Sequence, residues 1–134
     1  MKKRKVAEPA NHKFPPFDFV ASSEVDEGIL LGTVTDARRI QEFIHRRRRQ
    51  MIIHSVIYYR LNDNVVSDHT WQEWANQLAA VQQMYPALKC IGFHDELFDD
   101  WDGTTGNHLD LVEYYSHAQS VLGYHREKYG LLTF

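Results

Sequence analysis

The feature that most constrains this fold is a stretch of twenty-five residues without glycine or proline, residues 37–61. Thr35 is placed to cap a helix there, and Asp36 suits the positive end of the helix dipole. The apolar residues do not form one narrow stripe but nearly encircle the second half of the segment. They are Ile40, Phe43, Ile44, Met51, Ile52, Ile53, Val56, Ile57, Tyr58 and Leu61. We therefore predict a long helix over residues 36–61 whose second half is buried on several sides.

A second helix is predicted after a short polar break. The letters NDN at 62–64 favour a turn, because Asn and Asp side chains bond their own backbone. Ser67 is a suitable N-cap, and Pro86 ends the helix after about Tyr85. Its apolar residues recur at three- and four-residue spacing. They are Trp71, Trp74, Ala75, Leu78, Val81 and Tyr85. So short a connection predicts an antiparallel helical hairpin.

The rest of the chain adds a third helix and an arm. Residues 110–129 fit a helix that ends at Gly130. Its apolar face comprises Leu111, Tyr115, Ala118, Leu122 and Tyr129. Residues 1–34 form a basic arm with three of the four prolines, and residues 17–35 suit a loop with short strand-like pieces. The predicted fold class is mainly α: a small helical domain over residues 35–134, built on the hairpin plus the C-terminal third helix, with an extended N-terminal arm.

Length and composition bound the setting of the protein. A chain of 134 residues fits one small domain. The single cysteine, Cys90, excludes an internal disulfide framework and fits a reducing compartment. Apolar runs are too short to cross a membrane, and no signal-peptide core follows the basic start. We expect a cytoplasmic protein without a membrane partner, and its oligomeric state stays open.

Charge is distributed unevenly along the chain. Residues 1–50 hold eleven Lys and Arg against seven Asp and Glu, whereas residues 51–134 hold four against eleven. Four consecutive arginines, residues 46–49, could meet an acidic protein or nucleic acid. Four neighbours on a helix point around most of its circumference, however, and aromatic interleaving is missing. A solvated helix face is therefore the favoured interpretation, with nucleic-acid binding as the weaker one.

One segment resembles a known family. Residues 54–88, HSVIYYRLNDNVVSDHTWQEWANQLAAVQQMYPAL, resemble the small N-terminal helical domain of bacterial NAD-dependent DNA ligases. Short ligase-like proteins of this kind also occur in bacteriophage genomes, where a segment similar to FDDWDGTTGNHL, residues 98–109 here, follows the hairpin. That recurrence implies that the loop and the hairpin form one surface.

The resemblance implies a ligand site. In the family this domain grips the nicotinamide mononucleotide half of NAD. Carried over to this sequence, the gripping residues are His54, Tyr58, Tyr59, Asp68, Trp71 and Gln72. Gln72 replaces a family aspartate and loses its negative charge. The aromatic residues that remain can still hold flat rings of many kinds, including an NAD-type, nicotinamide mononucleotide-type or other nucleotide.

The same residues have a purely structural alternative. Tyr58, Trp71 and Trp74 could be core residues that join the hairpin, and Asp68 with Ser67 could form only a helix cap. Spacing alone favours this alternative, and the resemblance brings the two interpretations level.

Ligation chemistry is not expected. It requires a lysine nucleophile in a Lys-x-Asp-Gly motif, and this chain has Asp100 at the lysine position of DWDG, residues 100–103. No histidine, serine or cysteine lies in a recognisable catalytic motif. We therefore expect a non-enzymatic protein without catalytic residues.

The acidic loop at residues 90–109 allows two further interpretations. Its carboxylates and histidines could bind a divalent ion, but the spacing is not that of a calcium loop, so no metal site is predicted. DGTTG, residues 102–106, could offer N–H groups to a phosphate, although a tight turn is the favoured interpretation.

Three functions remain in order of preference. The first is a phage-type binding protein that captures an NAD-related nucleotide, with sequestration of a host defence signal as one use. The second is a protein-interaction module, either a virion component or an inhibitor of a host enzyme, in which the hairpin is only a scaffold. A nucleic-acid accessory protein ranks last.

Overall fold

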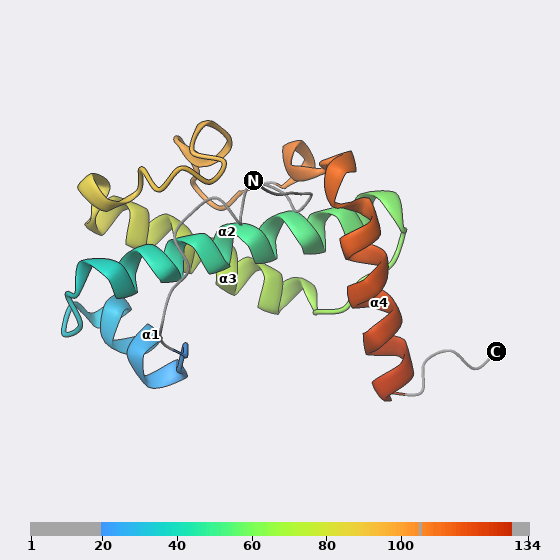
Figure 1. Cartoon of the computed structure of the whole chain (residues 1–134), viewed down its shortest axis with the longest axis horizontal. Coiled ribbons are helices and arrows are strands. Elements are labelled where there is room, and N and C mark those ends of the chain that lie inside the picture. The colour runs from blue at the N-terminus through green and yellow to red at the C-terminus, as the bar shows by residue number, and fades with distance from the viewer. Residues whose placement is uncertain (1–19, 105, 130–134) are drawn as a thin grey trace, which may run out of the picture.

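The computed structural model describes residues 20–104 and 106–129, which are mainly helical and contain no strand (Figure 1). The α-helices are α1 (Ser23–Leu31), α2 (Ala37–Arg60), α3 (Asp68–Met84) and α4 (Tyr115–Tyr129). Short 3₁₀ turns are η2 (Pro86–Leu88), η3 (Glu96–Phe98), η4 (Asn107–Leu109) and η5 (Val112–Tyr114). The predicted fold class is confirmed for these residues. The expected arm at residues 1–19 and the stop at Gly130 lie outside the described residues.

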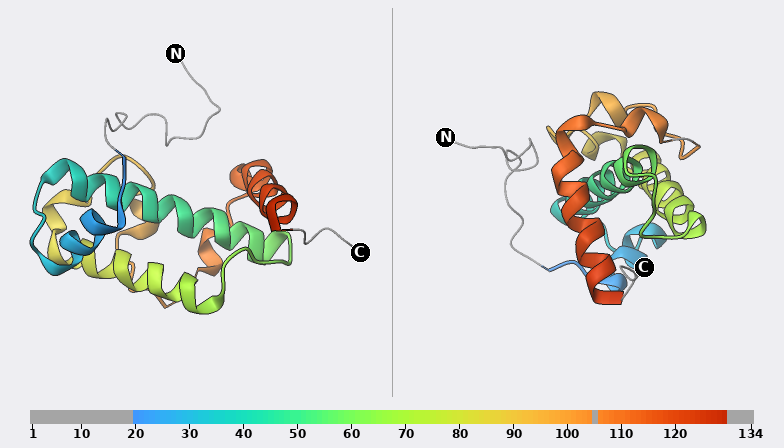
Figure 2. Two further views of the ribbon diagram at one scale, coloured as in Figure 1. Left: turned by 90° about the horizontal axis from the view of Figure 1, so that it is seen from below. Right: turned by 90° about the vertical axis from the view of Figure 1, so that its right-hand side faces the viewer.

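The helix α2 is the centre of the structure. It packs against α3 and α4 and also contacts η2, η4 and η5 (Figure 2). Its cap is Asp36, whose Oδ1 accepts the Arg39 N–H at 3.0 Å, one residue later than the expected Thr35. The predicted apolar residues of α2 are buried, except for the half-buried Leu61 and the exposed Tyr58. Burial on several sides is thus confirmed.

The predicted antiparallel hairpin is present. His54 stacks edge-on with Trp74 at 5.4 Å, and further back along α2 Arg48 bonds Gln82 near the end of α3. Residue numbers therefore rise along one helix as they fall along the other. Ser67 caps α3 by accepting the Thr70 N–H at 3.0 Å, as predicted.

Arg48 lies in the core, with 1% of its surface exposed. All five of its N–H donors are used. Nε and Nη2 donate to Oε1 of Gln82 at 3.0 and 2.8 Å, and Nη2 also donates to the Lys89 carbonyl at 2.8 Å. Nη1 donates to the Phe93 carbonyl and to Oδ1 of Asp95, each at 2.7 Å. One guanidinium thus joins α2, α3 and the loop that follows η2.

Asp95 completes this network as the counter-ion. Burial alone would raise its pKa, but hydrogen bonds from Arg48, Ile91 N–H and Gly92 N–H outweigh burial and lower the pKa of Asp95 below its ordinary value. The carboxylate therefore stays charged and holds the loop against Arg48.

The favoured interpretation of residues 46–49 as a solvated face is wrong. Arg47 is 7% exposed and donates to Gln77 and Gln50, while Arg46 pairs with Asp26 at 2.8 Å. Arg49 contacts the His117 ring of α4 at 2.9 Å. The reason is geometric: consecutive residues point around α2, and α2 is surrounded by other elements. The arginines are internal ties between helices.

The expected loop with strand-like pieces is wrong at residues 23–31, which form α1. Ser22 caps this helix by accepting the Val25 N–H at 3.1 Å, and Gly32 ends it in a left-handed conformation with φ of 82°. Ile29 is fully buried in the common core, and Asp26 binds Arg46. This part of the expected arm therefore belongs to the folded domain.

The third predicted helix begins later than expected. Residues 107–109 and 112–114 are 3₁₀ turns, and α4 starts at Tyr115. Ala118 and Leu122 are buried as expected, but the buried tyrosine is Tyr114 rather than Tyr115.

Within the described ranges, no helix is both long and apolar enough to cross a bilayer.

Replacing Arg48 with lysine tests its role as the tie between elements. Arg48→Lys keeps the charge but cannot bond all four acceptors, so we expect the free energy of unfolding to fall by about 3 kcal/mol. Urea unfolding measures the difference. The exposed Arg38 on the same helix provides a control, since Arg38→Lys should change stability by less than about 0.5 kcal/mol. Equal effects of the two substitutions would contradict the role assigned to Arg48.

Two glycines test whether α1 is packed as described. A Cβ on Gly28 would lie 2.4 Å from Cγ2 of Val34, whereas one on Gly123 in α4 would meet no atom within 4 Å. Gly28→Ala should destabilise the protein by about 1–3 kcal/mol through overpacking. Gly123→Ala should stabilise it by about 0.5–1 kcal/mol through helix propensity. Thermal unfolding of both variants checks the opposite signs.

Candidate functional site

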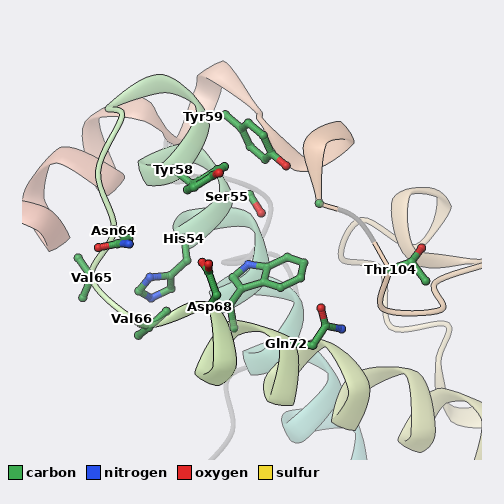
Figure 3. Close-up of a pocket in the computed structure, with 12 residues that line it drawn as sticks. His54, Ser55, Tyr58, Tyr59, Asn64, Val65, Val66, Asp68, Gln72 and Thr104 are labelled. Carbon is green, nitrogen blue, oxygen red and sulfur yellow. The ribbon is translucent and has the colours of Figure 1, made fainter.

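A pocket of about 270 Å³ lies at the turn end of the hairpin, where α2 ends and α3 begins (Figure 3). Its lining comes from α2, the connecting turn, α3 and the loop near residue 104. The lining residues are His54, Ser55, Tyr58, Tyr59, Asn64, Val65, Val66, Asp68, Trp71, Gln72, Thr104 and Gly106. All six residues expected to grip a ligand are in this set. The structure thus brings the predicted site residues together around one cavity.

Two tyrosines form the α2 side of the pocket. Tyr58 and Tyr59 lie in the last turn of α2, and they are 54% and 45% exposed. Their rings meet edge-on, with centroids 4.8 Å apart. The structural alternative, in which Tyr58 is a core residue, is therefore wrong. These ring faces are available to stack on a flat ligand.

The α3 side of the pocket is packed against the protein core. Trp71 is half-buried and packs edge-on against Trp101 with centroids 6.4 Å apart. Trp101 in turn donates its Nε1–H to the Ala75 carbonyl at 3.0 Å. Trp71 and Trp74 both pack against the core, so for them the structural alternative holds in part. Trp71 contributes to both the core and the pocket wall.

The loop at residues 102–106 closes the pocket beside Trp71. A Cβ on Gly106 would lie 2.7 Å from the Trp71 ring and 2.8 Å from Oγ of Ser55. Only a glycine lets the loop approach α2 and α3 this closely. The expectation that loop and hairpin form one surface is confirmed for the described residues.

The same loop is a tight turn, as the favoured interpretation has it. Gly103 has φ of 85°, and Oδ1 of Asp102 accepts both the N–H and the hydroxyl of Thr104. These bonds lower the pKa of Asp102 below its ordinary value and leave Thr104 no free donor for a phosphate. Thr105 lies outside the described residues.

Gln72 anchors that turn to α3. Its Nε2 donates to the Gly103 carbonyl at 2.7 Å and to Oδ1 of Asn76 at 3.0 Å. Both amide protons are thus used within the protein, and only the amide oxygen is left to meet a ligand. Gln72 positions the loop that lines the pocket.

Among the described residues that line the pocket, Asp68 carries the one formal charge, and none is a lysine or arginine. Asp68 is exposed at the first position of α3, and its carboxylate makes no hydrogen bond or ion pair with any described residue. It is not part of the cap, which Ser67 forms alone. The carboxylate is therefore available to accept hydrogen bonds from a ligand hydroxyl or to face a cationic ring.

Two neighbouring residues on α2 bring unsatisfied polar atoms to the pocket wall. Nδ1 of His54 and Oγ of Ser55 are both buried without a hydrogen-bond partner in the described part of the chain. Burial, with a smaller contribution from His125, lowers the pKa of His54 to about 4. His54 is therefore uncharged at neutral pH.

Sequence reasoning missed the rest of the lining. Ser55, Asn64, Val65 and Val66 carry no motif, and Gly106 contributes by lacking a side chain. Thr104 was considered only as a phosphate donor. The recurrence of the glycine loop beside the hairpin was the one signal that pointed to this side of the pocket.

The acidic loop uses its charges within the protein. Asp95 binds Arg48, and Asp99 lies 3.5 Å from the Lys89 ammonium. His94 bonds the hydroxyl of Tyr114 through Nε2 at 2.8 Å. Across the described ranges, no three His, Cys, Asp or Glu side chains come together as metal ligands.

Comparison with protein-family models, with curated protein sequences and with solved structures finds no significant match to this chain. The resemblance to the ligase domain therefore rests on the residues of the hairpin and the glycine loop.

The lowered pKa of His54 gives a dependence of stability on pH. Between about pH 6.5 and 4 the unfolded chain binds a proton at His54 and the folded protein does not, so the free energy of unfolding falls as the pH falls. A shift of this size corresponds to about 3 kcal/mol. His54→Phe keeps a ring against Trp74 and should flatten this part of the profile.

Urea unfolding at several pH values checks this expectation. The exposed His69 supplies the control, because His69→Phe should keep the wild-type dependence of the free energy of unfolding on pH. His94 and His117, whose pKa values are also lowered by burial, account for a remaining slope in His54→Phe. A His54 ring that titrates near pH 6.5 by NMR would contradict the assignment.

Proposed function

We propose that the pocket at the turn end of the hairpin binds an NAD-related nucleotide, with the heteroaromatic ring inside the pocket and the phosphates outside it. The observation that carries this proposal is the convergence of Tyr58, Tyr59 and Trp71 with the unpartnered carboxylate of Asp68 around one cavity. Aromatic faces stack on a flat ring, and a carboxylate accepts hydrogen bonds from ribose hydroxyls.

The size of the pocket favours a ring with its sugar over a whole dinucleotide. Its volume of about 270 Å³ lies just below the range typical of pockets for drug-sized ligands. A shallower depression adjoins it across the same two tyrosines and is lined by Tyr58, Tyr59, Asn62, Asp63 and Asn64. In this proposal the second half of a dinucleotide lies along that depression.

The charge of the pocket favours the same orientation. A phosphate would meet Asp68 and no lysine or arginine among the described residues of the lining, whereas the carboxylate of Asp68 would attract a cationic nicotinamide ring. Asp68 thus supplies the negative charge that Gln72 lacks relative to the ligase family.

In this proposal the protein binds its ligand without converting it. Sequestration of a nucleotide signal, such as one made by a host defence system, is the use that such a protein would have. The ligand is held by stacking and hydrogen bonds, so the effect on signalling would depend on the amount of protein present.

A protein-interaction module is the second candidate, and exposed apolar side chains favour it. Val112 is 63% exposed and Tyr124 is 64% exposed, the first on η5 and the second on α4. Side chains of this kind on neighbouring elements can form the apolar part of an interface.

Thermal unfolding with a panel of ligands tests the proposed function. The panel contains NAD, nicotinamide mononucleotide, ADP-ribose and cyclic nucleotides. At 100 times its dissociation constant, a true ligand should stabilise the protein by about 2.7 kcal/mol. Tyr58→Ala and Asp68→Ala should each abolish most of this stabilisation.

Tyr124→Ala is the control, because it removes an exposed tyrosine that does not line the pocket. It should keep the full ligand response. A flat response of the wild type across the panel would refute nucleotide binding and leave the interaction module as the better candidate.

A further inference from the structure

Ser55 presents a polar atom that the folded protein does not use. The residue is 1% exposed, it lines the pocket, and its Oγ has no hydrogen-bond partner among the described residues. In Figure 3 its hydroxyl points away from α2, toward the side of the pocket on which Thr104 lies. A serine inside a helix can bond the carbonyl one turn earlier, and this one does not. Ser55 therefore places an unpaired hydroxyl at the wall of the cavity, beside Gly106.

The described surroundings of Ser55 offer its hydroxyl no partner. Gly106 lies so close that a Cβ there would be 2.8 Å from Oγ, yet no polar group among the described residues of that loop bonds the hydroxyl. The remaining neighbours on this side include the Trp71 ring, which offers no acceptor in its plane. A buried hydroxyl without a partner is unfavourable, so a ligand that bonds it gains affinity at this point.

We propose that the Ser55 hydroxyl is a specificity-determining group that hydrogen-bonds an uncharged polar substituent on the ligand's ring, such as a carboxamide, and that the pocket rejects a carboxylate at the same position. This inference rests on the proposed function, because it assigns the edge of the ring that enters the same pocket. The proposed function states that a ring enters the pocket, and the role of Ser55 specifies which substituent that ring carries.

The charge of the pocket disfavours a carboxylate on the ligand's ring. A hydroxyl can donate to a carboxamide oxygen or accept from its nitrogen, so either orientation of the amide is satisfied. A carboxylate would lose its hydration in a cavity whose described lining carries the negative charge of Asp68 and no lysine or arginine. His54 beside Ser55 is uncharged at neutral pH and cannot compensate.

Two ligands that differ only in this substituent provide the test. Nicotinamide mononucleotide carries the carboxamide, and nicotinic acid mononucleotide carries the carboxylate. Calorimetric titration of the wild type should show at least about tenfold tighter binding of the amide. Ser55→Ala should weaken binding of the amide by about five- to tenfold, which corresponds to one hydrogen bond with an uncharged group. Ser116→Ala, at an exposed site on α4, should change neither affinity.

The stability of ligand-free Ser55→Ala separates a binding role from a structural one. Removing an unsatisfied buried hydroxyl should leave the melting temperature unchanged or raise it. The combination of unchanged or higher stability with weaker binding is the expected result. A clear loss of stability would show that Ser55 bonds within the protein, and this would overturn the inference.

The other outcomes are distinguishable. Equal binding of the amide by Ser55→Ala and the wild type, or preference of the wild type for the acid, would overturn the role of Ser55 but leave nucleotide binding intact. A wild type that binds neither mononucleotide, nor any ligand of the thermal panel, would refute the proposed function and the inference together.

Discussion

The fold depends on one buried guanidinium whose five donors all have partners. Removing Arg48 from water is unfavourable, and the structure offsets this with two carbonyls, an amide oxygen and a carboxylate from α3 and the loop that follows η2. Because those acceptors come together only when α2, α3 and the following loop are all in place, the network selects one arrangement of the hairpin. The apolar residues around it supply the driving force but would tolerate small shifts. The pocket at the turn end of the hairpin depends on the same arrangement, because α2 and α3 supply two of its walls.

Helices were predictable where local patterns decide them. Three such patterns predicted the helices correctly. They are the stretch without glycine or proline in α2, the Ser67 cap, and the three- and four-residue spacing of apolar residues in α3. The short helix α1 was missed although Ser22, Glu24 and Asp26 form a good helix start, because Gly28 and the helix's small size obscured its periodicity. The burial of Arg48 could not be predicted, since its partners Gln82 and Asp95 lie 34 and 47 residues away along the chain.

The site divides in the same way. Its aromatic residues and Asp68 were predictable because a short antiparallel hairpin must bring the end of one helix beside the start of the next. Ser55 was not predictable, because a serine in a helix belongs to no sequence motif. It matters because its buried hydroxyl has no hydrogen-bond partner among the described residues. Gly106 contributes through the absence of a side chain, which becomes meaningful only when the neighbouring atoms are known. Both depend on a loop closing over the hairpin from more than thirty residues away.

The last helix reaches the pocket through the turn between α2 and α3. Arg126 of α4 forms an ion pair with Asp63, and the next residues of that turn, Asn64, Val65 and Val66, line the cavity. Hydrogen bonds from the Asn64 N–H and from Arg126 lower the pKa of Asp63, which keeps this link charged at neutral pH. The C-terminal helix therefore acts as a brace on one wall of the pocket. Because α4 also packs on α2, which supplies another wall of the cavity, a displacement of α4 would reach the pocket by two routes.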